Sequence, residues 1–111
     1  KVMQDFQING IAHITGGGIT ENLPRVLPKN AKLHFAIEQD SWPVLPIFDL
    51  VRDLGNVEEA EMYKTFNMGI GMILVVKEAD AWKIVKKLIR LGENAHIIGQ
   101  VRKGKSGVSY I

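Results

Sequence analysis

Six consecutive residues, His13-Ile14-Thr15-Gly16-Gly17-Gly18, combine side chains and backbone that suit the binding and conversion of anionic substrates. A histidine exchanges protons near pH 7, and a threonine hydroxyl both donates and accepts hydrogen bonds. A glycine run leaves backbone N–H groups open to a phosphate or a carboxylate, above all beside the start of a helix. The segment therefore predicts an anion-binding loop, with His13 as its acid, base or hydrogen-bond donor.

The same six residues also fit a purely structural interpretation. Glycine adopts positive φ at the lowest steric cost, so three glycines suit a sharp turn between a strand and a helix. A single histidine in a strand is more often a packed or edge residue than a catalyst. Both interpretations stay open at the level of the residues, because a bare glycine run is a weak motif.

Two further segments offer polar groups to the same kind of site. Asn22 and Arg25 follow the glycines within the first helical turns, and a guanidinium group pairs well with phosphate oxygens. Asn67 precedes an apolar run, where its amide suits a substrate, and Gly69 leaves room beside it. In the structural alternative, Arg25 is an ordinary surface cation and Gly69 accommodates a crossing helix.

No metal site is predicted. The chain has no cysteine, which excludes disulfides and thiolate zinc ligands and agrees with a reducing compartment. His34 and His96 stand in separate predicted strands without the spacing of metal ligands. The remaining carboxylates of interest are interpreted as helix caps and surface groups: Asp40, Glu58, Glu59 and Glu61.

Alternating strands and helices must position these residues. Apolar clusters and alternation predict strands at residues 8–15, 31–38, 69–76, 94–101 and 108–111. Capping residues and an apolar helical period predict a short helix before Pro28 and helices at 46–55, 56–65 and 78–91. The run 69–76 lacks polar alternation, which is typical of a strand covered on both faces in the middle of a sheet.

The two longer helices carry apolar stripes that predict packing faces. The stripes are Ile47, Leu50, Val51 and Leu54 in the first, and Ala81, Trp82, Val85, Leu88 and Ile89 in the second. The last two strands are expected to form a closing hairpin around residues 103–105. The order β-α-β-α-α-β-α-β-β then predicts one layered α+β domain, with helices packed on a mixed sheet, partly like a ferredoxin-type split βαβ.

Composition places the 111 residues among globular domains, with 46% apolar and 23% charged residues. A net charge of +2 gives no argument for nucleic acid, and the longest apolar run is too short to span a bilayer. We therefore expect no nucleic-acid or membrane partner and, without a secretion signal, a cytoplasmic protein. The chain begins at Lys1 rather than methionine, so we expect a piece of a longer protein.

The charge is unevenly distributed along the chain. Residues 83–105 contain a single acidic residue, Glu93, and seven basic ones: Lys83, Lys86, Lys87, Arg90, Arg102, Lys103 and Lys105. A patch that captures phosphorylated molecules is one interpretation. The favoured one is a solvated helix face followed by a charged turn.

Several blocks stand in a fixed order along nearly the whole chain. They are residues 11–18 with 21–28, Trp42-Pro43 with Phe48, residues 61–72, and 92–95 with Ile98-Gly99. Together they closely resemble the C-terminal signature of the aminoimidazole ribonucleotide synthetases, also called phosphoribosylformylglycinamidine cyclo-ligases. The Glu-Asn-Leu-Pro-Arg and Glu-Met-Tyr blocks are the most specific, because neither is generic loop chemistry.

The resemblance implies an ATP-dependent enzyme of purine biosynthesis that converts formylglycinamidine ribonucleotide to aminoimidazole ribonucleotide, with Mg2+ assisting. It implies homodimers of two-domain subunits, in which an N-terminal domain handles ATP and Mg2+. This chain would be an incomplete C-terminal domain, without the N-terminal ATP-binding one. We expect it to bind no cofactor and to be inactive on its own.

The resemblance also implies roles for single residues. His13 is the candidate catalytic or substrate-orienting residue. The candidates for contact with the ribonucleotide or its phosphate, or for support of the loop, are Thr15, Gly16, Gly17, Gly18, Asn22, Arg25, Asn67 and Gly69. Two alternatives remain: a related ATP-using enzyme, of the formylglycinamidine ribonucleotide amidotransferase or selenophosphate synthetase type, or a non-catalytic module that binds a phosphorylated metabolite.

Overall fold

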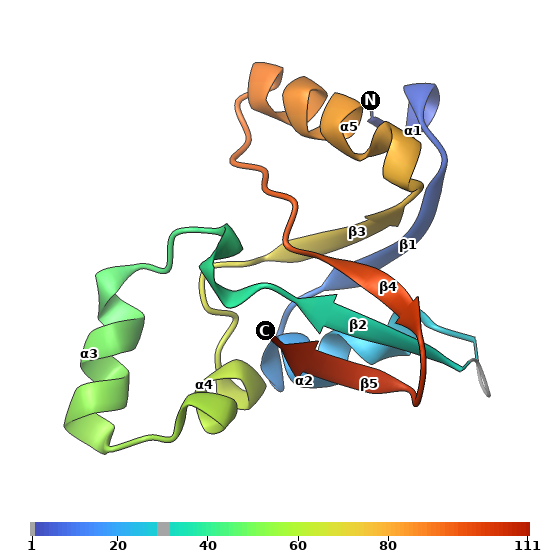
Figure 1. The fold of residues 1–111 in the computed structure, drawn as a ribbon. Coiled ribbons are helices and arrows are strands. Elements are labelled where there is room, and N and C mark those ends of the chain that lie inside the picture. Colours follow the sequence, from blue (N-terminus) through green and yellow to red (C-terminus); the bar gives the residue numbers. More distant parts are fainter. Residues whose placement is uncertain (1, 29–31) are drawn as a thin grey trace.

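The computed structural model describes residues 2–28 and 32–111, which form five strands and five α-helices (Figure 1). In chain order they are α1 (Val2–Asp5), β1 (Ile8–His13), α2 (Gly18–Asn22), β2 (Leu33–Ile37), α3 (Pro46–Gly55), α4 (Glu59–Thr65), β3 (Met72–Val76), α5 (Glu78–Arg90), β4 (Gly99–Lys103) and β5 (Gly107–Tyr110). Two 3-10 turns, η1 (Leu23–Val26) and η2 (Gln39–Ser41), follow α2 and β2. From β1 onward the predicted order is confirmed, while α1 was not predicted. The predicted start of the second strand, residue 31, lies outside the described residues.

The strands form two sheets. β1 and β3 pair antiparallel, with His13 opposite Met72, and the Ile14 N–H extends the pair by donating to the Gly71 carbonyl at 2.9 Å. β2 lies in the middle of the second sheet, antiparallel to β4 and parallel to β5. The α+β class with a mixed sheet is therefore confirmed.

Two strand predictions are wrong. In the part of the chain described, β3 pairs only with β1, and Met72 at its start is 60% exposed, so the run 69–76 is not a central strand. The predicted hairpin of the last two strands is absent from the same residues, because β2 lies between β4 and β5. Their connection passes around the start of β2, where the Gly104 N–H donates to the Lys32 carbonyl at 3.1 Å. The predicted strand 94–101 begins only at Gly99.

The core lies between the three-stranded sheet, the α2–η1 segment and α4. Ile19, Leu23 and Met62 are its most completely buried large side chains. The rings of Tyr63 and Tyr110 stack with centroids 4.2 Å apart and join α4 to β5. Burial of side chains of this size stabilises a fold by roughly 1.5–3 kcal/mol each. The core therefore holds α2 firmly behind the loop that precedes it.

Much of the apolar surface of the two longer helices is not buried in this chain. α3 lies at the periphery (Figure 1), and its predicted stripe residues Ile47, Leu50 and Leu54 are each more than half exposed. Phe48 of the same helix faces inward instead and contacts Phe66 edge to face, with centroids 6.1 Å apart. On α5 the stripe prediction is also wrong in part, because Trp82 is 66% exposed. The buried residue of α5 is Ile84, which lay outside the predicted stripe.

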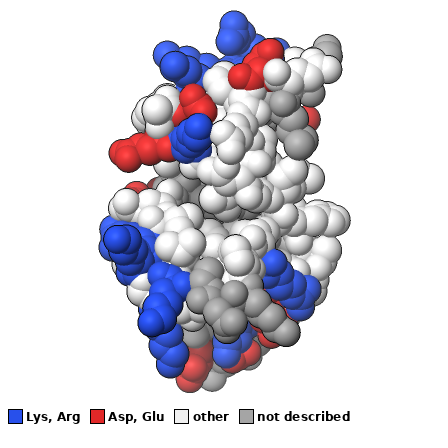
Figure 2. All heavy atoms as spheres, turned by 90° about the vertical axis from the view of Figure 1, so that its right-hand side faces the viewer, with Lys and Arg blue, Asp and Glu red and all other residues white. Residues whose placement is uncertain are grey.

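The basic stretch falls into two separate groups. α5 and the β4–β5 connection lie at opposite ends of the molecule (Figure 1). Figure 2 shows lysine and arginine side chains towards both ends of one face, with an uncharged band between them. On α5, Lys87 forms an ion pair with Asp5 of α1. A single patch made of all seven basic residues is therefore not present among the described residues.

Candidate functional site

The glycine run forms a tight turn between β1 and α2. The Gly18 N–H donates to the Thr15 carbonyl at 3.0 Å, which closes a four-residue turn around Gly16 and Gly17. Gly17 has a φ of 96°, in the left-handed region that the third residue of a type II turn requires. The structural interpretation of the run is thus satisfied at Gly17.

Gly18 is required for a different reason, the close approach of two helices. It is buried, has a φ of 61°, and lies against the end of α4. A Cβ atom at this position would overlap the backbone carbonyl oxygens of Tyr63 and Phe66. Gly16, in contrast, is exposed, and a Cβ there would have no atom within 4 Å. The fold accounts for two of the three glycines and leaves Gly16 unexplained.

Asn22 organises the loop from behind. Its side chain is only 5% exposed, and Nδ2 lies 3.2 Å from the carbonyl oxygens of Thr15 and Gly16 and 2.8 Å from that of Gly18. Its Oδ1 accepts from Thr15 Oγ1 and from Arg25 Nη1, each at 3.3 Å. One buried carboxamide therefore connects the turn, the following helix and the arginine.

The direction of the loop N–H groups follows from these bonds. In a planar trans peptide the C=O and the next N–H point in opposite directions, and the chain has no cis peptide in its described part. Because the carbonyls of Thr15 and Gly16 point at Asn22, the N–H groups of Gly16 and Gly17 point away from it. Two successive donors thus face outward beside an open Cα, the arrangement that favours an anion.

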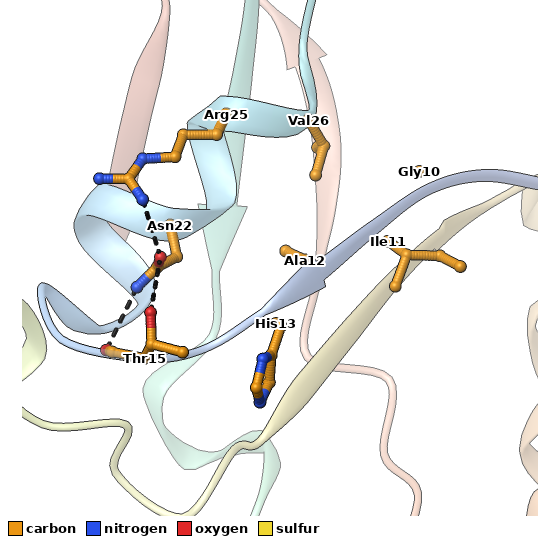
Figure 3. Close-up of a pocket in the computed structure, with 8 residues that line it drawn as sticks. All are labelled: Gly10, Ile11, Ala12, His13, Thr15, Asn22, Arg25 and Val26. Carbon is orange, nitrogen blue, oxygen red and sulfur yellow. Dashed lines mark hydrogen bonds between the residues drawn. The ribbon is translucent and has the colours of Figure 1, made fainter.

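His13, Thr15, Asn22 and Arg25 border one open cavity of about 540 Å3 along β1 (Figure 3). The lining also includes Gly10, Ile11, Ala12 and Val26. These four were not predicted, because small and apolar residue types carry no chemical signal. The structure thus brings four of the nine candidate site residues to one cavity, and Gly16–Gly18 follow Thr15 directly in the loop.

His13 and the Asn22 network lie on different sides of β1. Ala12 and Ile14 are buried, whereas Ile11 and His13 are exposed on the other face of the strand. Figure 3 shows the His13 imidazole pointing away from the Thr15–Asn22–Arg25 cluster. β1 ends at His13, and Thr15 lies at the start of the turn, where its hydroxyl donates to Asn22. The imidazole is thus exposed on the face of β1 that points away from the Asn22 network.

Asn67 and Gly69 occupy a turn of their own before β3. The Gly69 N–H donates to Asn67 Oδ1 at 2.8 Å, and the Ile70 N–H donates to the Asn67 carbonyl at 3.0 Å. Between them, Met68 has a φ of 55° and is held by Trp42, whose Nε1 donates to the Met68 carbonyl at 3.0 Å. Neither Asn67 nor Gly69 borders the cavity beside His13.

The buried Tyr63 and the half-buried Tyr110 lie beneath α2 and have raised pKa values, and neither was predicted from the sequence. Burial raises the pKa of Tyr63, and the carboxylates of Glu59 and Asp40 raise it further. Burial raises the pKa of Tyr110 to about 12, against the opposing effect of the Thr20 hydroxyl, which shares a 2.8 Å hydrogen bond with it. Both phenols are therefore neutral at physiological pH and support the fold rather than proton transfer.

A resident metal ion does not fit the part of the chain that the structure describes. Within residues 2–28 and 32–111, no three histidine, aspartate or glutamate side chains lie close enough to hold one. None of the helices described is long and apolar enough to cross a bilayer.

Known proteins resemble this chain over nearly all of its length. Residues 1–111 match the family described as AIR synthase related protein, C-terminal domain. The phosphoribosylformylglycinamidine cyclo-ligase of Brevibacillus brevis is 51% identical over 110 residues, which are 99% of this chain and 31% of that protein. The cyclo-ligase of Syntrophotalea carbinolica is 55% identical over 103 residues, which are 93% of this chain and 29% of that protein. The chain thus spans about a third of these relatives.

A solved structure shares the fold. Escherichia coli HypE, a hydrogenase maturation protein, superposes with a TM-score of 0.70 and covers 98% of this chain, which corresponds to 33% of HypE. The sequences are 20% identical. At that identity the likeness extends to the arrangement of strands and helices and not to chemistry.

Proposed function

Because the chain belongs to the AIR synthase related protein C-terminal domain family, we propose that it is the C-terminal part of a phosphoribosylformylglycinamidine cyclo-ligase. The observation that carries this proposal is the 51% identity over 110 residues to a protein of that name. The relatives are about three times as long, since the chain covers 31% of that one. The activity therefore belongs to a longer protein, and the 111 residues alone are expected to be inactive.

In the proposed reaction, ATP transfers its terminal phosphoryl group to the formyl oxygen of formylglycinamidine ribonucleotide. An amidine nitrogen of the same molecule then attacks the activated formyl carbon and displaces phosphate. The products are aminoimidazole ribonucleotide, ADP and phosphate. We assign the handling of ATP and Mg2+ to an N-terminal domain outside this chain, and propose a cytoplasmic homodimer as the working form.

The loop between β1 and α2 is proposed to bind an anionic group of the ribonucleotide or the phosphate that is transferred. The outward N–H groups of Gly16 and Gly17 support this role, since they are preorganised donors that need no rearrangement. The exposed Cα of Gly16 leaves room for the ligand to approach the backbone. Thr15 and Gly18 complete the loop, and Asn67 with Gly69 is proposed to form the adjacent wall.

His13 is proposed to act on the substrate from the exposed end of β1. Its imidazole has no hydrogen-bond partner among the described residues, so both nitrogens are available to a ligand. It can therefore donate to a substrate oxygen or accept a proton from the attacking amidine. Arg25 is proposed to add positive charge at the edge of the cavity.

The test is a product assay on the full-length protein that contains this chain. With ATP, Mg2+ and formylglycinamidine ribonucleotide, we expect aminoimidazole ribonucleotide by mass spectrometry, and ADP in equal amount. Turnover of a different substrate, such as selenide, in place of ring closure would refute the activity.

His13→Asn in the same protein is expected to lower kcat by about 100-fold or more, the usual size of an acid–base contribution. His96→Asn is the matched control, because His96 is exposed and no site includes it. Equal kinetics of the two variants would remove His13 from the mechanism.

A further inference from the structure

The side chain of Asn22 has no hydrogen-bonding capacity left for a substrate. Nδ2 has two hydrogens, and three carbonyl oxygens surround it at 2.8–3.2 Å. Oδ1 has two lone pairs, and it accepts from Thr15 and Arg25. The side chain is 5% exposed, so a ligand in the cavity has no open access to it.

The orientation of this carboxamide is dictated by its neighbours. Backbone carbonyls can only accept hydrogen bonds, and a guanidinium can only donate them. The NH2 group must therefore face the loop, and the oxygen must face Arg25. A rotated carboxamide would place oxygen against three carbonyl oxygens and NH2 against a cation. Arg25 thereby contributes to the loop geometry even where no anion contacts it.

We infer that Asn22 is a positioning residue rather than a contact for the substrate phosphate. It turns the carbonyls of Thr15 and Gly16 inward, and this turns the N–H groups of Gly16 and Gly17 outward, away from Asn22. The catalytic consequence rests on the proposed function, whereas the geometric part concerns the loop alone. Arg25 acts in the same system by holding Oδ1.

The geometric part is tested in the 111-residue chain by NMR. Asn22→Asp keeps the shape but replaces the NH2 donor with an acceptor. We expect the amide chemical shifts of Gly16 and Gly17 to change, and their resonances to broaden by exchange, because the turn loses its hydrogen bonds from the Asn22 NH2 group. The matched control is Asn94→Asp, because Asn94 is exposed and makes no side-chain hydrogen bond to the described residues.

Protonation gives a signature that a merely bulky or destabilising change lacks. At low pH a protonated Asp side chain at position 22 regains one O–H donor, so part of the wild-type Gly16 and Gly17 shifts should return. Asn22→Ala should show the same loss without recovery at low pH. If the Asn22→Asp chain fails to fold, the loop shifts of the Asn22→Ala chain still test the inference. Wild-type loop shifts in folded Asn22→Ala and Asn22→Asp chains would overturn the inference.

The catalytic part is tested in the full-length protein. Misplacement of a catalytic loop by about 1 Å costs roughly 100-fold in rate, so Asn22→Ala is expected to lower kcat by about that factor. KM for the ribonucleotide should change much less, since Asn22 does not contact it. A large rise in KM with unchanged kcat would identify Asn22 as a binding residue and refute the inference. If the wild-type protein lacked cyclo-ligase activity, the proposed function would fail while the NMR result still decided the role of Asn22.

Discussion

Replacing each loop glycine by alanine and measuring the unfolding free energy shows which glycines the fold requires and which one it does not require. At Gly18 the change acts in two ways. A left-handed backbone costs an L-residue roughly 1–2 kcal/mol, and Gly18 has a φ of 61°. The added methyl group would also overlap the carbonyl oxygens of Tyr63 and Phe66, so α2 and α4 must move apart.

Forced repacking of this kind costs about 1–3 kcal/mol. The sum for Gly18→Ala is therefore about 2–5 kcal/mol of unfolding free energy. At Gly17 the backbone term applies as well, and a methyl group would meet both the flexible carboxylate end of Glu21 and its Cβ, which is fixed to α2. We expect a loss of at least about 1–2 kcal/mol there, without the clash against backbone oxygens that Gly18→Ala adds.

Gly16→Ala is the matched control for stability. Its Cβ would meet no atom within 4 Å, and its φ is not in the left-handed region. We expect its unfolding free energy to stay within about 0.5 kcal/mol of wild type. Urea denaturation of the 111-residue chain, followed by circular dichroism, measures all three variants. A Gly18→Ala chain as stable as wild type, or a Gly16→Ala chain as unstable as Gly18→Ala, would refute the described packing of α2 on α4.

Three other substitutions give further tests. The pKa of Tyr110 is about 12 in the folded chain and about 10 in the unfolded chain, so the unfolded state loses this proton first as pH rises. The stabilisation from Tyr110 should therefore be complete below pH 10 and should fall as pH rises toward 12. Tyr110→Phe should show a smaller alkaline loss in urea titrations at pH 9 and 11. Trp42→Phe removes the donor to the Met68 carbonyl and should cost about 1–3 kcal/mol, measured by the same denaturation. Leu54→Lys should leave stability within about 0.5 kcal/mol, since Leu54 is 79% exposed, and a loss above 1.5 kcal/mol in thermal unfolding would show that α3 packs differently.

The order of elements was predictable from the sequence because each signal is local. Pro46 marks the start of α3, and Gly55 and Gly92 mark the ends of α3 and α5, without reference to the rest of the chain. Strand pairing is not local. The hairpin prediction for β4 and β5 was wrong because proximity along the chain favoured their pairing, whereas β2 lies between them. Apolar periodicity likewise found α3 but not its buried face, since Ile47 and Leu50 stay exposed in this chain.

The residues of the candidate site were predictable from the sequence, but the separate role of each residue was not. Residue types alone singled out Gly16, Gly17 and Gly18 as equivalent members of one loop. Only the packing of α2 on α4 distinguishes Gly18, whose role depends on a contact more than 40 residues away in the chain, with Tyr63 and Phe66. The role of Asn22 also depends on the folded turn, because three carbonyls converge on it only there.

The unequal surroundings of the two tryptophans make this chain its own optical probe. Trp42 is buried and its indole N–H is bonded to the turn before β3, whereas the Trp82 ring lies in solvent. Fluorescence from Trp82 is therefore open to an aqueous quencher, and emission from Trp42 is shielded. In a Trp82→Phe chain the tryptophan fluorescence would come from Trp42 alone. Trp42 is bonded to the turn before β3, and the residue after β1, Ile14, is hydrogen-bonded to Gly71 at the end of that turn. A ligand that changes the conformation of the loop after β1 would then be detected by the intrinsic fluorescence of Trp42, without an added label.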